Sequence, residues 1–198
     1  MDFIEKAKGF LFEPSKTFNA CKDESLNEAI KYYAIIALIF SAISALLFVI
    51  AFTLFGSMMG LGNLGMMFGA GAGIMSAVLI FVMLFVIFII GAFIGGAILH
   101  IFVYIVGGRK GITQTLKALM YGGTPMLLFG WIPYIGFIAS IWSLILEIIG
   151  IQKLQELTTI RAVIAVVVIP AIIAVILAIL LAAFIAAFIF GMGGPRGY

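Results

Sequence analysis

A stretch of 77 residues, from Tyr32 to Gly108, contains no Asp, Glu, Lys or Arg. A continuous helix of that length would measure roughly 115 Å at about 1.5 Å per residue, several times the roughly 30 Å hydrocarbon core of a bilayer. The chain must therefore turn back within the stretch. Composition agrees, because 65% of the residues are apolar and 10% are charged, whereas soluble domains carry about 25% charged residues. The sequence predicts an all-α, polytopic integral membrane protein.

Basic residues divide the rest of the chain into clusters, and their positions set the expected topology. The first cluster precedes the apolar stretch, the second runs from Arg109 to Lys117, the third consists of Lys153 and Arg161, and Arg196 stands alone. Because basic loops stay on the cytoplasmic side, we expect the first three clusters inside and Arg196 outside. The N-terminus is then cytoplasmic, the C-terminus is external, and the protein is a multi-pass component of the cell (plasma) membrane.

This arrangement requires an even number of crossings between successive inside clusters, which favours a five-helix transmembrane bundle. The membrane domain, 29–190, would have spans at about residues 29–55, 75–106, 113–130, 134–152 and 161–190. Residues 1–28 form a cytoplasmic or interfacial segment, and residues 191–198 form a short external tail. The glycine- and methionine-rich connector 56–73 is expected to be an outer loop or a shallow re-entrant hairpin, because a crossing there would place Arg109 outside.

The third and fourth predicted spans are short and irregular. Only 29 uncharged residues separate Lys117 from Glu147, whereas two full crossings need about 20 apolar residues each. The pair either draws its charged flanks into the membrane or forms a helical hairpin that stops short of the far side. Tyr121-Gly-Gly-Thr-Pro125 breaks the third span, and Gly130 to Gly136 supplies the turn. Irregular backbone at membrane depth is tolerated only when it is buried or lines a cavity, so we expect function here.

The N-terminal segment has the pattern of short helices at the membrane interface. Apolar residues recur at helical spacing opposite charged ones, which predicts an amphipathic helix that lies in the inner interface or docks on the protein itself. The apolar residues are Phe3, Ile4, Ala7, Phe10 and Leu11, and the charged ones are Asp2, Glu5, Lys6 and Lys8. Pro14 suits the start of a second short helix, and Ser25 with Glu28 predicts a capping box at the start of the first span.

Ionisable residues inside or beside the spans form the candidate site. Burying such groups in lipid costs a few kcal/mol, so they normally face protein or water. We expect a polar cluster, open to the cytoplasm, near the inner ends of spans two, three and four. Its members are His100, Gln114, Lys117, Tyr121 and Glu147. The cluster either pins helices together by mutual neutralisation or binds a proton, an ion or a lipid headgroup.

Enzyme motifs are missing from the sequence. It contains no His-Glu-x-x-His, Gly-x-Ser-x-Gly or Walker-type pattern, and Gly107 to Gly111 fits a tight turn. A single cysteine, Cys21, excludes an intramolecular disulfide and a multi-cysteine metal site. We therefore expect a non-enzymatic protein with no catalytic, cofactor-binding or metal-binding residues. The lipid bilayer is its first partner, and no basic patch for nucleic acid is visible.

Motifs along nearly the whole chain resemble the Ypt/Rab-interacting (Yip) membrane-protein family, in its short prokaryotic or archaeal-type form. They lie before the first span, around the break and turn of the third and fourth spans, and at the start of the last span near Arg161. The residues that carry the likeness are Phe10, Pro14, Phe18, Tyr121, Gly122, Pro125, Pro133, Gly136 and Gly150.

The resemblance implies a membrane scaffold or adaptor that organises membrane or partner proteins. Eukaryotic members of the family act in Golgi and endoplasmic-reticulum traffic through small GTPases, but we do not expect their long cytosolic N-terminal region in this chain. A small GTPase is therefore a partner only by family analogy; other membrane proteins or a homo-oligomer are further expectations. The alternative function is a small transporter, channel or lipid-translocating protein that uses the broken third helix and the inner polar cluster.

Overall fold

The computed structural model describes residues 1–55 and 73–192, and the regular structure within these two ranges is helical. The N-terminal half contains α1 (Phe3–Phe12), α2 (Pro14–Ala20), α3 (Leu26–Phe55) and α5 (Gly73–Ile105). The C-terminal half contains α6 (Ile112–Gly122), α7 (Thr124–Phe129), α8 (Ile135–Leu154), α9 (Thr159–Val163), the π-helix η2 (Ile164–Val168) and α10 (Ile169–Met192). Apart from Gly73, the predicted connector 56–73 lies outside the described residues, and so does the tail after Met192.

Four helical segments of the described chain are long and apolar enough to cross a membrane. They are Leu26–Phe55, Ile74–Ile105, Ile135–Leu154 and Thr159–Phe188, the last of which joins α9, η2 and most of α10. Their exposed surfaces consist largely of Leu, Ile, Val and Phe side chains, which suit lipid rather than water. The prediction of an all-helical, multi-pass membrane protein is confirmed at this level.

The predicted third span, about 113–130, is divided between two short helices. α6 has 11 residues and α7 has 6, so together they rise only about 26 Å at 1.5 Å per residue. The break follows from Pro125, which has no N–H to donate to the carbonyl of Tyr121. The hydroxyl of Thr124 donates to that carbonyl instead, over 2.6 Å. A hydroxyl therefore replaces the lost backbone bond, as a buried carbonyl requires.

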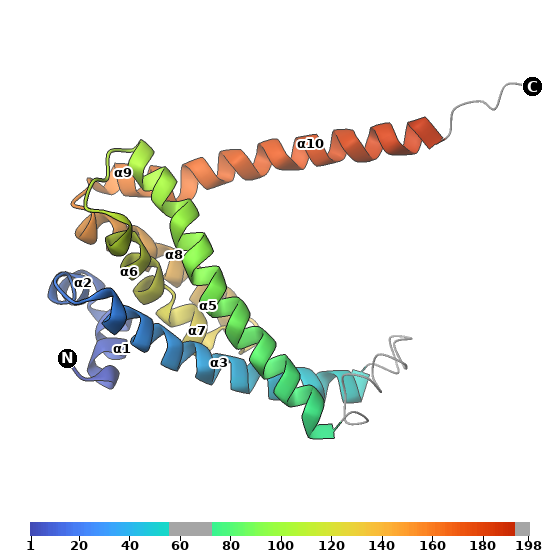
Figure 1. Ribbon diagram of the computed structural model, residues 1–198, viewed down its shortest axis with the longest axis horizontal. Coiled ribbons are helices and arrows are strands. Elements are labelled where there is room, and N and C mark those ends of the chain that lie inside the picture. The colour runs from blue at the N-terminus through green and yellow to red at the C-terminus, as the bar shows by residue number, and fades with distance from the viewer. Residues whose placement is uncertain (56–72, 193–198) are drawn as a thin grey trace, which may run out of the picture.

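The broken helix occupies the middle of the bundle. α6 packs on α3, α5 and α8, while α7 packs on α3 and α8. Figure 1 shows α3 and α5 side by side and antiparallel, and both continue past α7. The chain returns toward its starting end through a turn at 130–134, where Tyr134 has a φ of 65° and a Cβ on Gly136 would lie 2.6 Å from the carbonyl oxygen of Gly130. Only glycine fits at position 136 without a shift of the turn.

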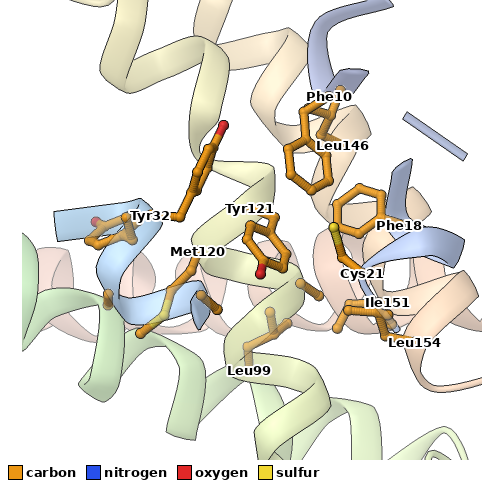
Figure 2. Packing of buried hydrophobic residues seen from close by; sticks show 14 of the residues in the cluster. Phe10, Phe18, Cys21, Tyr32, Leu99, Met120, Tyr121, Leu146, Ile151 and Leu154 are labelled. Atoms are coloured by element: carbon orange, nitrogen blue, oxygen red, sulfur yellow. The ribbon is translucent and has the colours of Figure 1, made fainter. Parts of the chain in front are cut away.

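Tyr121 lies at the centre of the hydrophobic core and is fully buried. Its ring centroid is 4.8 Å from that of Phe10 on α1 and 5.4 Å from that of Tyr32 on α3. The ring of Phe18 on α2 lies 4.8 Å from Phe10. Figure 2 shows these aromatic side chains gathered around Tyr121. Because α1 and α2 contribute fully buried rings, they dock on the membrane domain itself.

The last helix leaves the bundle. Figure 1 shows α10 extending away from the other helices, and every residue from 171 to 188 is exposed. The departure begins where η2 precedes Pro170. A proline ring collides with the carbonyl four residues earlier and lacks a donor, and the wider turn of a π-helix relieves both problems. The irregularity of this helix is thus a π-helical turn just before Pro170.

Candidate functional site

Three connections meet at one end of the bundle, which we call the charged end. They are residues 21–25, 106–111 and 155–158. The Glu156 carboxylate accepts hydrogen bonds from Lys110 and Lys22, each at 2.5 Å. These two hydrogen bonds lower the pKa of Glu156 to about 2. One ion-pair cluster therefore ties together segments that belong to all three basic regions expected on the same side of the membrane.

A partly buried ion pair joins α1 to the loop before α3. The Nζ of Lys6 donates to both carboxylate oxygens of Glu24 at 2.8 Å, and the Tyr121 hydroxyl donates to Oε2 of Glu24 at 2.5 Å. Burial alone would raise the pKa of Glu24, but the hydrogen bonds from Lys6 and Tyr121 and the Lys6 charge hold it below its usual value. The sequence pattern placed Lys6 on an outer polar face, and this was wrong: Lys6 is only 6% exposed.

A second lysine completes this arrangement from α6. Lys117 is fully buried, and its Nζ donates to the backbone carbonyls of Lys22 at 2.7 Å and Glu24 at 2.8 Å. Gln114 also donates to the carbonyl of Lys22, over 3.3 Å, while its Oε1 is buried without a partner among the described residues. We call Lys6, Glu24, Lys117 and Tyr121 the clamp, because together they hold the N-terminal helices on the broken helix.

His100 lies in a different hydrogen-bonded group. Its Nδ1 forms a hydrogen bond of 2.9 Å with Oγ1 of Thr115. The same Oγ1 accepts a hydrogen bond from Nε2 of Gln155, over 2.9 Å. Gln155 donates further to the carbonyl of Gly111 over 2.8 Å. Within residues 1–55 and 73–192, no hydrogen bond or ion pair joins His100 to Lys117. His100 therefore links α5, α6 and the connection after α8.

Glu147 lines a separate pocket of about 470 Å³ between the broken helix and its neighbours α3, α5 and α8. The polar side chains of the lining belong to Tyr33, Ser140, Ser143 and Glu147, and the other walls are apolar. The Glu147 carboxylate has no hydrogen bond or ion pair with the described part of the chain. The structure thus distributes the predicted cluster over three places: Lys117 and Tyr121 in the clamp with Gln114 beside them, His100 beside Thr115, and Glu147 in the pocket.

Sequence reasoning missed Lys6 and Glu24, because their role depends on how the N-terminal helices fold back onto α6. One signal was present: Lys117 and Tyr121 lie four residues apart on α6 and so share a face. A buried cation there needs acceptors from another segment. No group of three or more His, Cys, Asp or Glu side chains in the described ranges could hold a metal ion.

The motif residues shape the contacts of α6 and α8. A Cβ on Gly122 would lie 2.7 Å from Cγ of Glu147, and one on Gly150 would lie 2.9 Å from the ring of Phe18. Glycine therefore permits a close approach at both positions. The remaining motif residues stand at the start of α2 (Pro14), at the helix break (Pro125), in the turn before α8 (Pro133), in the first turn of α8 (Gly136) and in the aromatic core (Phe10, Tyr121).

Fold and sites together define a class: helical membrane proteins in which a central broken helix is clamped to an N-terminal pair of short helices. The chain belongs to the Yip1 domain family, whose profile matches residues 8–182. The match begins within α1 and ends within α10, so it includes Lys117, Tyr121 and Glu147. Neither the curated proteins nor the solved structures give a significant match to the chain.

Proposed function

We propose that the protein is a non-enzymatic membrane scaffold or adaptor of the Yip type, which organises membrane or partner proteins in the cell membrane. The observation that carries the proposal is α10, whose residues 171–188 are all exposed. Apart from η2, no helix of the described chain packs extensively on α10. A membrane helix gains little hydrophobic energy by leaving lipid, so helices associate through close packing. A span left out of its own bundle is available for packing with another protein.

The clamp supports the same function. It fixes α1 and α2 on α6 through partly buried charge-assisted hydrogen bonds, which are stronger than neutral ones. The charged end therefore presents a rigid surface rather than a loose tail. Other membrane proteins or a second copy of the chain would bind along α10. A small GTPase at the charged end is a partner only by analogy with the family.

Replacement of residues 171–188 by leucine tests the proposal. The variant keeps the length and hydrophobicity of the span, but it replaces the varied side chains on its surface by identical ones. We expect it to insert and fold normally while it loses the partner that co-purifies with the unchanged protein. Leucine at Ile94, Ile98 and Ile101, three exposed positions on α5, serves as the control and should retain that partner. A polyleucine α10 that keeps every partner would contradict the proposal.

For the topology, we propose five spans with the charged end in the cytoplasm and the C-terminus outside. In this arrangement α6 with α7 is the third span, α8 the fourth and α10 the main part of the fifth. Single cysteines at Ser57, Thr113 and Thr158, in a Cys21→Ser background, test it with an impermeant thiol reagent. Positions 113 and 158 should react from the cytoplasm and position 57 from outside. Cytoplasmic labelling of position 57 would overturn the topology.

A second candidate function, a small transporter, channel or lipid-translocating protein, is favoured by the pocket beside Glu147. An ionisable residue within a membrane span commonly marks a pathway for a substrate or an ion. Purified protein in liposomes distinguishes the two candidates. A scaffold should leave the distribution of ions and lipid probes unchanged, whereas transport that disappears in Glu147→Gln would favour the second.

A further inference from the structure

The pocket lined by Glu147 opens sideways from the bundle. Of its lining residues, Ile87 and Gly91 on α5 and Ser140 and Leu144 on α8 are exposed. Glu147 lies seven residues before the end of α8 at Leu154, about 10 Å along the helix at 1.5 Å per residue. Because α8 is a candidate span, the opening would face the acyl-chain region of the surrounding lipid. We call this space the Glu147 pocket.

Two polar groups in the Glu147 pocket have unused hydrogen-bonding capacity. The Glu147 carboxylate is without a partner among the described residues. Ser143 accepts a hydrogen bond from the backbone N–H of Met126 at 2.9 Å, but its own hydroxyl hydrogen has no acceptor in the part of the chain that the structure describes. Ser143 and Glu147 are four residues apart on α8 and so lie on one face. The pocket thus offers an acceptor beside a donor.

The charges of the residues that line the Glu147 pocket restrict the chemical class of ligand that can bind there. No Lys, Arg or His belongs to it, so an anion such as a phosphate would meet the Glu147 carboxylate without a compensating cation, which is unfavourable at low dielectric. A hydroxyl group matches the pair because it donates to the carboxylate and accepts from Ser143. An ammonium group donates only and would leave Ser143 unsatisfied. The volume of about 470 Å³ falls within the range of roughly 300–1,000 Å³ typical of small-molecule sites.

We propose that the Glu147 pocket binds the hydroxyl of an uncharged membrane lipid alcohol. Glu147 accepts the hydrogen bond from the lipid hydroxyl, Ser143 donates one to it, and the hydrocarbon chain lies along the apolar walls at Ile87 and Leu144. This site goes beyond a scaffold function, because it gives the protein a lipid ligand held within the membrane. It requires no movement of the lipid across the bilayer.

Photolabelling of the full chain tests the proposal. The protein is reconstituted in phosphatidylcholine vesicles that contain a photoreactive long-chain primary alcohol, its methyl ether or a chain-matched primary alkylammonium. Labelled peptides are then mapped. We expect the alcohol to label the pocket segments of α5 and α8 at least about tenfold more than the ether, because a site built for a hydroxyl strongly rejects the analogue that lacks it. Equal labelling by the ether, or stronger labelling by the ammonium probe, would overturn the proposal.

Variants separate the pocket from the general lipid-facing surface. A Cβ on Gly91 meets nothing within 4 Å, so this lining position has room for the start of a side chain. Gly91→Phe should fill part of the pocket and reduce alcohol labelling at least about tenfold. Ile94→Phe, an exposed position outside the lining, is the matched control and should label normally. Undiminished labelling of Gly91→Phe would contradict the proposal.

A second variant removes the acceptor itself. Glu147→Leu should lose the preference for the alcohol over the ether. Because the carboxylate has no partner among the described residues, its replacement by an apolar side chain should raise Tm rather than lower it. Loss of the preference together with a higher Tm cannot be ascribed to misfolding. A retained preference would exclude Glu147 as the acceptor.

Discussion

The hydroxyl of Tyr121 donates a hydrogen bond to Oε2 of Glu24 over 2.5 Å, and this bond joins the broken helix to the loop before α3. The same carboxylate receives Nζ of Lys6 from α1. One acidic side chain therefore connects three segments that are distant in sequence. Since each donor is nearly or fully buried, the strength of these bonds governs how firmly the N-terminal helices are attached.

Tyr121→Phe tests the contribution of the hydroxyl alone. The phenylalanine ring keeps the aromatic contacts with Phe10 and Tyr32, but the hydrogen bond to a charged acceptor is lost, which should lower the free energy of unfolding by about 1.5–3 kcal/mol. Unfolding in detergent measures the change. Tyr134→Phe, at a residue 92% exposed, is the control and should be close to neutral. Equal effects of the two variants would contradict the role of the clamp.

Glu24→Gln tests the ion pair. It leaves the nearly buried ammonium of Lys6 without a counter-charge. Because the Glu24 side chain is 23% exposed, we expect a cost below that of a fully buried pair, about 1.5–3 kcal/mol. Glu28→Gln is the matched control, because Glu28 pairs with Lys31 in an exposed i,i+3 geometry at 3.4 Å and such pairs contribute about 0–1 kcal/mol. We expect a large loss of unfolding free energy for the first variant and almost none for the second. Similar losses of unfolding free energy in the two variants would show that the Lys6–Glu24 pair stabilises the fold no more than an exposed ion pair.

Acidification should weaken the clamp. The pKa of Glu24 in the folded protein lies below its usual value of 4.5, so folding favours the charged carboxylate. Its stabilising contribution is fully present above the unfolded pKa and is lost as pH falls through the lower folded pKa. The Tm difference between the unchanged protein and Glu24→Gln should therefore be largest near neutral pH and shrink below about pH 4.5. Glu156 titrates in the same direction, but it is present in both proteins. If this Tm difference did not change with pH, the ionisation of Glu24 would not be coupled to folding.

The sequence predicted those parts of the fold that depend on local pattern. α3 (Leu26–Phe55) and α5 (Gly73–Ile105) coincide closely with the first two predicted spans, about 29–55 and 75–106, because length and hydropathy alone determine whether a helix suits a bilayer. The helix break also followed from residue chemistry, since Pro125 cannot donate a backbone bond. The burial of Lys6 could not be predicted in this way, because helical periodicity gives the face of a residue but not which segment covers it.

The residues of the candidate site could likewise be predicted only as far as local sequence pattern determines their positions. Sequence spacing placed Lys117 and Tyr121 on one face of α6, and both contribute to the clamp. Glu147 was predicted to join Lys117 and Tyr121 because it lies at a similar depth in its span. In the structure it lies against Gly122 and lines the pocket instead. Depth within a membrane follows from residue number along a helix, whereas the rotation of α8 about its axis depends on packing. That packing is decided by contacts such as Gly150 against Phe18, which no local pattern specifies.

The thiol of Cys21 reports on attachment of the N-terminal helices. Cys21 is fully buried, and burial together with the nearby negative charge of Glu24 raises its pKa to about 11. Only about one thiol in a thousand is then ionised at pH 8, and the thiolate is the reactive form. Alkylation followed by mass spectrometry should be at least about 100-fold slower for Cys21 than for an exposed Thr158→Cys. Equal rates would mean that α1 and α2 detach readily from α6.

Glycine at position 122 should be needed for contact between α6 and α8. A Cβ there would lie 2.7 Å from Cγ of Glu147 and 3.0 Å from its backbone nitrogen. Because the backbone cannot rotate away, Gly122→Ala must push the helices apart, at a cost of about 1–3 kcal/mol. Gly91→Ala is the opposite case: its Cβ meets nothing within 4 Å, and the higher helix propensity of alanine should add up to about 1 kcal/mol. Unfolding free energies in detergent should therefore change with opposite signs. If both variants were stabilised, the close contact at Gly122 would not limit the fold.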